Sequence, residues 1–158
     1  MKHNLFFVLS GFSRSTAKYL NKKSSYFVVA VFVCGTGDVQ YRSDSVVKFE
    51  NDKTSVGFGR LSNFHSTGVF TTEKEGLYLV SSSIMSSTSN AHYYIMRNGA
   101  QLVYVYIGDS CSSIQPTSYT GSMVAAVHLN IGDRIYVKTD ISMKVHGPAS
   151  CFTIVKIN

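Results

Sequence analysis

The segment that most constrains the fold is "AHYYIMRNGAQLVYVYIGD", residues 91–109. Two runs rich in aromatic and β-branched residues flank Asn98-Gly99, and Asn-Gly supplies the positive φ angles that a tight type I′ turn requires. The segment therefore predicts an antiparallel hairpin. From Tyr26 onward, apolar side chains repeat with a period of two wherever a period is clear, which indicates strands and not helices.

Other segments combine the same alternation with flanking turn residues. The stretch 121–139 predicts a strand, a turn through Gly132-Asp133 and another strand. The remaining expected strands lie within 43–50, 54–59, 74–85 and 147–158. Together these give about eight to ten short strands and no helix after the N-terminal segment. The composition is 44% hydrophobic, with 10 Tyr, 10 Phe and 2 Pro, and it favours an all-β sandwich or jelly roll.

Charge divides the chain near residue 25. Residues 1–25 hold five of the 15 basic side chains and no acid, whereas residues 26–158 hold ten basic and nine acidic side chains. We therefore expect a basic N-terminal extension, 1–25, and a nearly neutral domain, 26–158, which is unsuited to nucleic acid. The extension fits a secretory signal, a transit peptide or a simple tail equally well. No apolar run reaches the roughly 20 residues of a membrane span, so we expect none.

Two runs break the alternation. "YFVVAVFVC", residues 26–34, is apolar at every position, and "CFTIVKI", residues 151–157, nearly so. An antiparallel sandwich strand has one face on the core, so a strand that is apolar on both faces needs a second cover. Another subunit is the favoured cover. The alternatives are a signal-peptide core after Lys22-Lys23 and a central strand beneath a loop.

"NFHSTGVFTTEKEGLYLV", residues 63–80, resembles the central signature of the globular head of the C1q/tumour-necrosis-factor-like superfamily. Phe70, Gly76 and Tyr78 fit the spacing of that signature. Further matches are "RNG" at 97–99, "HLNIGDRIYV" at 128–137 and the final "CFTIVKI". We expect Gly68 and Gly76 to bracket the loop between two strands, and Phe70 and one face of 77–80 to fill the core. No Gly-X-Y collagen repeat precedes the domain, so the resemblance is to stalkless members.

This resemblance implies a ten-stranded jelly-roll β-sandwich that trimerises through a sheet containing the first and last strands. The three cysteines lack metal-ligand spacing. By themselves they allow one disulfide with one thiol left over, or three free thiols. Because the first and last strands of this fold pair antiparallel, the resemblance implies a bridge between Cys34 and Cys151.

No pattern of catalytic residues is evident. No serine sits in a G-x-S-x-G elbow, the serines of 81–89 suggest a polar outer face, and His128 suggests an outward-facing strand residue. We expect no enzyme activity. We also expect no required cofactor. Calcium is the one ion that the resemblance suggests, with Asp109 as the sole carboxylate of the corresponding loop 107–122, although calcium usually takes more than one carboxylate.

The resemblance implies a secreted homotrimer that binds glycan or other microbial or cell-surface ligands, in an innate-immune or lectin-like role. The alternatives are a signalling ligand for a protein receptor, as in tumour-necrosis-factor relatives, and a structural trimerisation domain. Tyrosines offer a stacking face with a polar tip. The expected ligand-binding residues, on loops and the outer face, are Arg97, Tyr104, Tyr106, Tyr119, Lys144 and His146.

Overall fold

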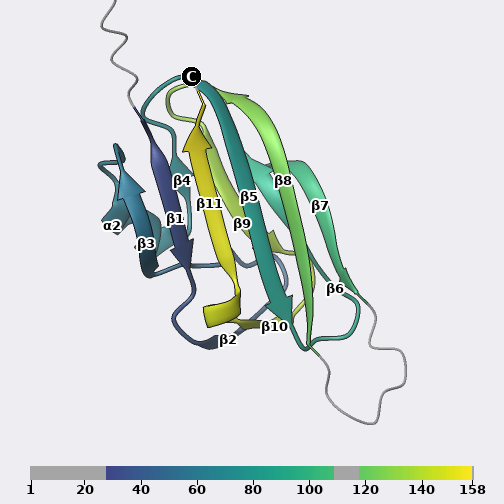
Figure 1. Cartoon of the computed structure of the whole chain (residues 1–158). Helices are drawn as coiled ribbons and strands as arrows, with labels where there is room; N and C mark the ends of the chain where they lie inside the picture. Colours follow the sequence, from purple (N-terminus) through teal and green to yellow (C-terminus); the bar gives the residue numbers. More distant parts are fainter. Residues whose placement is uncertain (1–27, 109–117, 158) are drawn as a thin grey trace, which may run out of the picture.

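Side chains that alternate along each strand form an inward and an outward set, and the inward sets of two antiparallel sheets meet in one core. The computed structural model describes residues 28–108 and 118–157. Figure 1 shows the two sheets as layers, one in front of the other, with the end of β11 (Cys151–Lys156) beside the start of β1 (Ala30–Cys34). The expected jelly-roll architecture is confirmed, with eleven strands in the described residues.

The sheet nearer the viewer in Figure 1, sheet A, joins the first and last strands. Besides β1 its strands are β2 (Asp38–Tyr41), β3 (Asn51–Val56), β5 (Gly76–Ser86), β8 (Tyr119–Leu129), β10 (Met143–His146) and β11 (Cys151–Lys156). β11 lies between β1 and β5, antiparallel to both. The long strand β5 pairs with β8 along its whole length. The expected antiparallel pairing of the first and last strands is confirmed.

The second sheet, sheet B, contains β4 (Phe70–Thr71), β6 (Ala91–Arg97), β7 (Ala100–Gly108) and β9 (Arg134–Thr139) in the order β4-β9-β6-β7. The β6–β7 hairpin turns at Asn98 and Gly99, whose φ angles are 52° and 88°, as predicted. The turn through Gly132 does not close a second hairpin, because β8 belongs to sheet A and β9 to sheet B. This turn carries the chain from one layer to the other.

One helix occurs where none was expected. α2 (Leu61–Thr67) is seven residues long, so it is too short to show a helical stripe in the sequence. It buries Phe64 and ends at Gly68, whose φ is 72° and whose N–H donates to the Phe64 carbonyl. A Cβ at Gly68 would lie 2.5 Å from the carbonyl oxygen of Val47, so this corner requires glycine. Gly68 therefore ends a helix, and the short strand β4 intervenes before Gly76 opens β5.

The expected strand at 43–50 was wrong in extent. Pairing there is an isolated bridge between Val46 and Lys138, and β3 begins only at Asn51. Val47 and Phe49 are nonetheless buried. The alternation of apolar and polar side chains in this stretch therefore reflects burial against the core and not pairing in a continuous β-ladder. A short 3₁₀ turn, η1 (Gly147–Ala149), links β10 to β11.

Tyr78 and Val80 of β5 point into the core, and Leu77 and Leu79 point outward. The expectation that Phe70 fills the core is also confirmed. The largest fully buried side chains are Tyr78, Tyr93, Phe49, Phe64, Phe70, Phe152, Ile84, Ile95, Leu129, Ile135, Met143 and Ile154. They come from both sheets, from α2 and, in the case of Phe49, from the stretch that precedes β3, so the core depends on every layer of the fold.

A buried tyrosine links the two sheets by hydrogen bonds. Tyr93 of β6 is fully buried, and its hydroxyl donates to the Gly121 carbonyl oxygen of β8 at 3.0 Å. The hydroxyl oxygen of Tyr93 in turn accepts from the Ser82 hydroxyl of β5 at 2.9 Å, because the Tyr93 proton is already donated to Gly121. Burial raises the pKa of Tyr93 to about 12, and the hydrogen bond from Ser82 opposes this shift in part.

A second network joins two of the sequence motifs. The carboxylate of Asp133 accepts from Arg97 at 2.7 Å, from the Asn98 amide at 2.6 Å and from the Asn130 backbone at 2.9 Å. Of these donors, Asn98 contributes most to lowering the pKa of Asp133. The "RNG" hairpin and the "GD" turn are therefore held together by one carboxylate with three donors.

Cys34 and Cys151 lie opposite each other in the β1–β11 ladder, with Cα atoms 4.0 Å apart. A disulfide joins them across 117 residues of sequence. The bond links the end of the first strand to the beginning of the last.

We expect Tyr93→Phe to lower the free energy of unfolding by about 1–2 kcal/mol, because Ser82 and Gly121 lose their partner. Tyrosine ionises near pH 10 in the unfolded chain and only near pH 12 here. The contribution of Tyr93 is therefore complete below about pH 10 and falls as the pH rises toward 12. Urea unfolding at pH 8 and pH 11 measures both effects.

The exposed Tyr104→Phe is the matched control for Tyr93→Phe, and it should retain the wild-type loss of stability between pH 8 and pH 11. If Tyr93→Phe loses as much stability as the wild type over this range, Tyr93 does not carry this dependence.

We expect non-reducing peptide mapping to recover Cys34 and Cys151 in one linked peptide pair. Cys34→Ala combined with Cys151→Ala should lower the free energy of unfolding by about 2–5 kcal/mol, because the bond restricts a long loop in the unfolded chain. Cys111→Ala, which leaves this bond in place, is the control. Recovery of both cysteines as free thiols would contradict the pairing.

Candidate functional site

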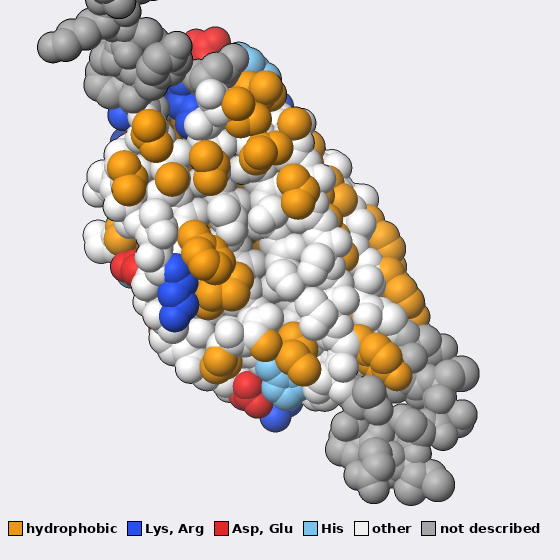
Figure 2. Space-filling model, viewed as in Figure 1, with side chains coloured by type: hydrophobic (Ala, Val, Ile, Leu, Met, Phe, Trp, Pro, Cys, Tyr) orange, Lys and Arg blue, Asp and Glu red, His pale blue; other side chains and the backbone are white. Residues whose placement is uncertain are grey.

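The outward side of sheet A carries a broad uncharged surface, which we call face A. One row of directly paired residues crosses five strands: Val56, Ala30, Val155, Leu79 and Ala126. The next row is Thr54, Phe32, Thr153, Ser81 and Val124. None of these ten side chains is charged. Figure 2 shows hydrophobic side chains over the upper part of this surface, uncharged atoms across its centre and charged side chains toward its margins.

Several apolar side chains of face A are open to solvent in the single chain. Val124 is 67% exposed, Val56 49%, Leu79 41% and Phe32 37%. A shallow hollow of about 630 Å³ beside Phe32 is lined by serine and threonine side chains together with the apolar Met123 and Val124. Within it, the Ser122 hydroxyl donates to the Ser83 hydroxyl at 2.9 Å. β1 is therefore buried on one side and apolar but uncovered on the other.

The outward side of sheet B carries a cluster of aromatic rings. Tyr104 and Tyr106 of β7, both predicted as ligand-binding residues, lie opposite Tyr94 and His92 of β6. The Tyr104 ring centroid is 5.6 Å from that of Tyr94 and 5.4 Å from that of His92. We call Tyr104, Tyr106, Tyr94 and His92 the aromatic face. Its two β6 members were not among the predicted site residues.

A single carboxylate supports the aromatic face. Asp140, just after β9, lies 2.6 Å from His92 Nε2 and accepts a hydrogen bond from the Tyr94 hydroxyl. The bond from Tyr94 is the main cause that lowers the pKa of Asp140, and the same bond raises the pKa of Tyr94. At the edge of this surface Lys138 forms a 2.6 Å ion pair with Asp44.

The other predicted residues fall into two further places. Lys144 and His146 of β10 both contact Asp38 of β2, at 3.1 Å and 2.9 Å, and together they lower the pKa of Asp38, Lys144 most. Tyr119 begins β8 next to Ser118, whose hydroxyl is 3.1 Å from His146 Nε2. Arg97 instead lies by the β6–β7 turn, bound to Asp133.

Ser118, His146 and Asp38 therefore form a serine–histidine–carboxylate chain that no sequence motif indicated. Nucleophilic catalysis also needs donors that hold the developing oxyanion. Here the Asp38 oxygen that faces His146 is shared with Lys144. The cluster ties β2 and β10 to the residue that precedes β8, and this structural role accounts for its contacts.

The structure does not describe Asp109, so calcium at that residue stays a prediction. Elsewhere in the described residues no group of three or more His, Cys, Asp and Glu side chains is placed to hold a metal ion.

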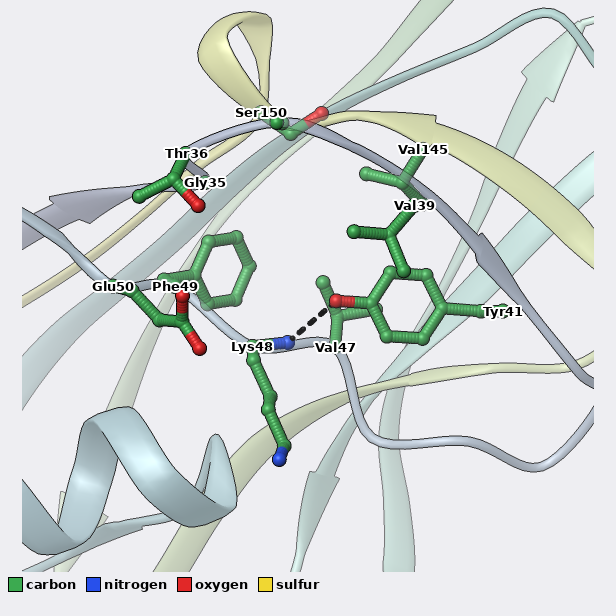
Figure 3. A pocket seen from close by; sticks show the side chains of 12 residues that line it. Gly35, Thr36, Val39, Tyr41, Val47, Lys48, Phe49, Glu50, Val145 and Ser150 are labelled. Atoms are coloured by element: carbon green, nitrogen blue, oxygen red, sulfur yellow. Dashed lines mark hydrogen bonds between the residues drawn. The ribbon is translucent and has the colours of Figure 1, made fainter.

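A cavity of about 350 Å³ opens beside β2 (Figure 3). Its apolar wall includes Val39, Phe49 and Val145, and the Tyr41 hydroxyl accepts from the Lys48 backbone at 3.1 Å. In Figure 3 the Lys48 side chain extends away from the cavity. None of the predicted site residues lines this cavity. Its polar groups do not converge on one point, so we do not assign it a ligand.

The model of the C1q domain family matches residues 30–153. A comparison with curated protein sequences gives no match. Among solved structures, the globular domain of a zebrafish complement 1qA protein is similar with a TM-score of 0.66 and 16% identity, over 82% of this chain and 98% of that chain.

Two cytokine structures are similar as well. The Eiger TNF of S. frugiperda has a TM-score of 0.65 and 20% identity, over 83% of this chain and 93% of that chain. Murine APRIL has a TM-score of 0.63 and 13% identity, over 82% of this chain and 99% of that chain. These likenesses agree with the fold, and the family match over most of the chain shows that the protein belongs to the C1q domain family.

Proposed function

We propose that the protein is a secreted, non-enzymatic homotrimer that recognises carbohydrate or other repeated patterns on microbial or cell surfaces, in an innate-immune or lectin-like role. The contrast between the two outward surfaces carries this proposal. Face A is uncharged and partly apolar, which suits contact with other copies of the chain. Sheet B presents exposed aromatic rings, which suit a ligand.

Face A supports the trimer. Leu79, Val124 and Val56 are largely exposed in one chain, and contiguous apolar surface of this kind marks interaction sites in soluble proteins. C1q and tumour-necrosis-factor-like domains form trimers. Contact through face A would cover the outward apolar side of β1 and β11. Their sequences, which are apolar on both faces, require such a cover.

Three copies of one site multiply a weak affinity when the ligand repeats on a surface. Ligand recognition is proposed for the predicted residues Arg97, Tyr104, Tyr106, Tyr119, Lys144 and His146. Of these, Tyr104 and Tyr106 share one surface, and Lys144 and His146 share another. Binding to glycans or bacterial surfaces that free sugar competes away tests this function.

Secretion is supported by the bond between Cys34 and Cys151, because disulfides persist chiefly in oxidising compartments. C1q-domain proteins are generally extracellular. In the part of the chain that the structure describes, no helix is long and apolar enough to cross a membrane.

The likeness to Eiger TNF and APRIL supports an alternative, a trimeric signalling ligand that engages a protein receptor at grooves between subunits. A third hypothesis is that the protein is a purely structural trimerisation domain. A dedicated protein receptor, with no binding to sugars or bacterial surfaces, would favour the signalling role over the recognition role.

We expect the full chain to have a mass of about 52 kDa by light scattering, three times the 17.4 kDa of one chain. Val124→Glu should give a folded monomer, because a carboxylate buried in an apolar interface is costly. Ile131→Glu, at a 71% exposed loop position outside face A, should remain trimeric. If the wild-type protein is a monomer at micromolar concentration, the proposed trimer is wrong, and so is the gain in affinity expected from three linked sites.

We expect the purified protein to hydrolyse p-nitrophenyl acetate no faster than Ser118→Ala. The reason is that the contacts of Ser118, His146 and Asp38 are those of a structural cluster. A rate that Ser118→Ala abolishes would contradict the non-enzymatic assignment. The His146→Gln variant would then separate nucleophile activation from nonspecific surface hydrolysis.

A further inference from the structure

The aromatic face on sheet B is more exposed than packing of the fold requires. Tyr104 and Tyr106 are each 47% exposed, whereas Tyr93, their neighbour on the other side of the sheet, is fully buried. Cross-strand aromatic pairs do stabilise sheets, but such stabilisation does not require half of each ring to remain in water. Exposed rings of this kind suit a ligand that stacks on them.

Hydrogen bonds hold the rings in place before any ligand arrives. The side-chain oxygen of Asn90 accepts from the Tyr106 hydroxyl at 2.7 Å, and its backbone oxygen lies 2.8 Å from His92 Nδ1. Asp140 holds His92 from the other side and holds Tyr94. Because these side chains are already ordered, a ligand would meet a smaller entropic cost on binding.

One polar group of the aromatic face is left for a ligand. Within the described residues the Tyr104 hydroxyl makes no hydrogen bond, whereas the hydroxyls of Tyr94 and Tyr106 are both engaged. The Tyr104 ring contacts the rings of Tyr94 and His92 in tilted geometry and is 47% exposed. Tyr104 therefore combines an open stacking surface with a free donor and acceptor at its tip.

The charges around the aromatic face favour a neutral ligand. Lys138 and Asp44 pair with each other at 2.6 Å, so Lys138 is not a free cation for an acidic group. The carboxylate of Asp140 would repel acidic sugars, and its contacts with Tyr94 and His92 reduce its capacity to bind a cation. Aromatic rings bordered by paired charges and hydrogen-bonding oxygens match the apolar C–H face and the hydroxyl rim of an uncharged sugar ring.

We propose that the aromatic face binds neutral saccharide residues, with Tyr104 as the stacking residue and with Asp140 and Asn90 as acceptors at its rim. This inference rests on the recognition function proposed above and names its ligand class and its location. The site lies on the opposite layer from face A, so assembly through face A leaves it open to solvent.

Isothermal titration calorimetry on the full chain tests the proposal with neutral gluco-, manno- and galacto-oligosaccharides, and with sialylated and sulfated oligosaccharides for comparison. We expect a neutral oligosaccharide to bind, and Tyr104→Ala to weaken it by at least about tenfold. Tyr104→Phe, which keeps the ring, should lose less than Tyr104→Ala. Ile131→Ala, an exposed apolar position away from the aromatic face, should bind like the wild type.

Each other outcome overturns a stated part of the proposal. Neutral-sugar binding that Tyr104→Ala leaves unchanged would place the site elsewhere while carbohydrate recognition stands. Preference for sialylated or sulfated sugars would overturn the neutral class. No saccharide binding by a folded, trimeric wild type would overturn this inference together with the carbohydrate part of the proposed function. Circular dichroism of Tyr104→Ala separates lost binding from lost folding.

Discussion

β1 and β11, which begin and end the described domain, lie side by side in an antiparallel ladder, and this pairing fixes which side chains of sheet A reach the core. A shift of one residue would turn Val31 and Val33 outward and Phe32 inward. The register continues through β5 to β8, so the apolar row from Val56 to Ala126 exists only because these strands are aligned. Pairing β1 with β11 closes a long loop of chain, but the entropic cost of loop closure rises only slowly with loop length. The disulfide also joins these two strands covalently.

This alignment separates two chemistries onto opposite layers. Face A presents small polar and apolar side chains on β3, β1, β11, β5 and β8 of sheet A, and the aromatic face of sheet B presents aromatic rings with ordered polar neighbours. Inside, Tyr93 connects the layers by hydrogen bonds to β5 and β8, so the spacing of the sheets is set by a polar contact as well as by apolar packing. One surface can therefore assemble while the other remains available.

The local parts of the fold could be predicted from the sequence, because Asn98-Gly99 and the period of two act over a few residues. The layer change between β8 and β9 could not, since the same Gly132-Asp133 turn chemistry serves a hairpin and a crossing equally well. α2 was missed because it is so short. The site was predicted only in part: Asp140 reaches His92 from 48 residues away and Asp38 reaches His146 from 108, distances at which no sequence spacing is informative.

The Cys34–Cys151 bond also bears on how the domain responds to force. Ala30 lies opposite Val155, so the start of β1 and the end of β11 meet at one pole of the molecule, and the disulfide lies at the other end of this ladder (Figure 1). Tension applied between the two chain ends would separate β1 from β11 one backbone hydrogen bond at a time, starting at the Ala30–Val155 end of the ladder. The disulfide would then stop this separation at Cys34 and Cys151, and the polypeptide between the two cysteines would bear no tension.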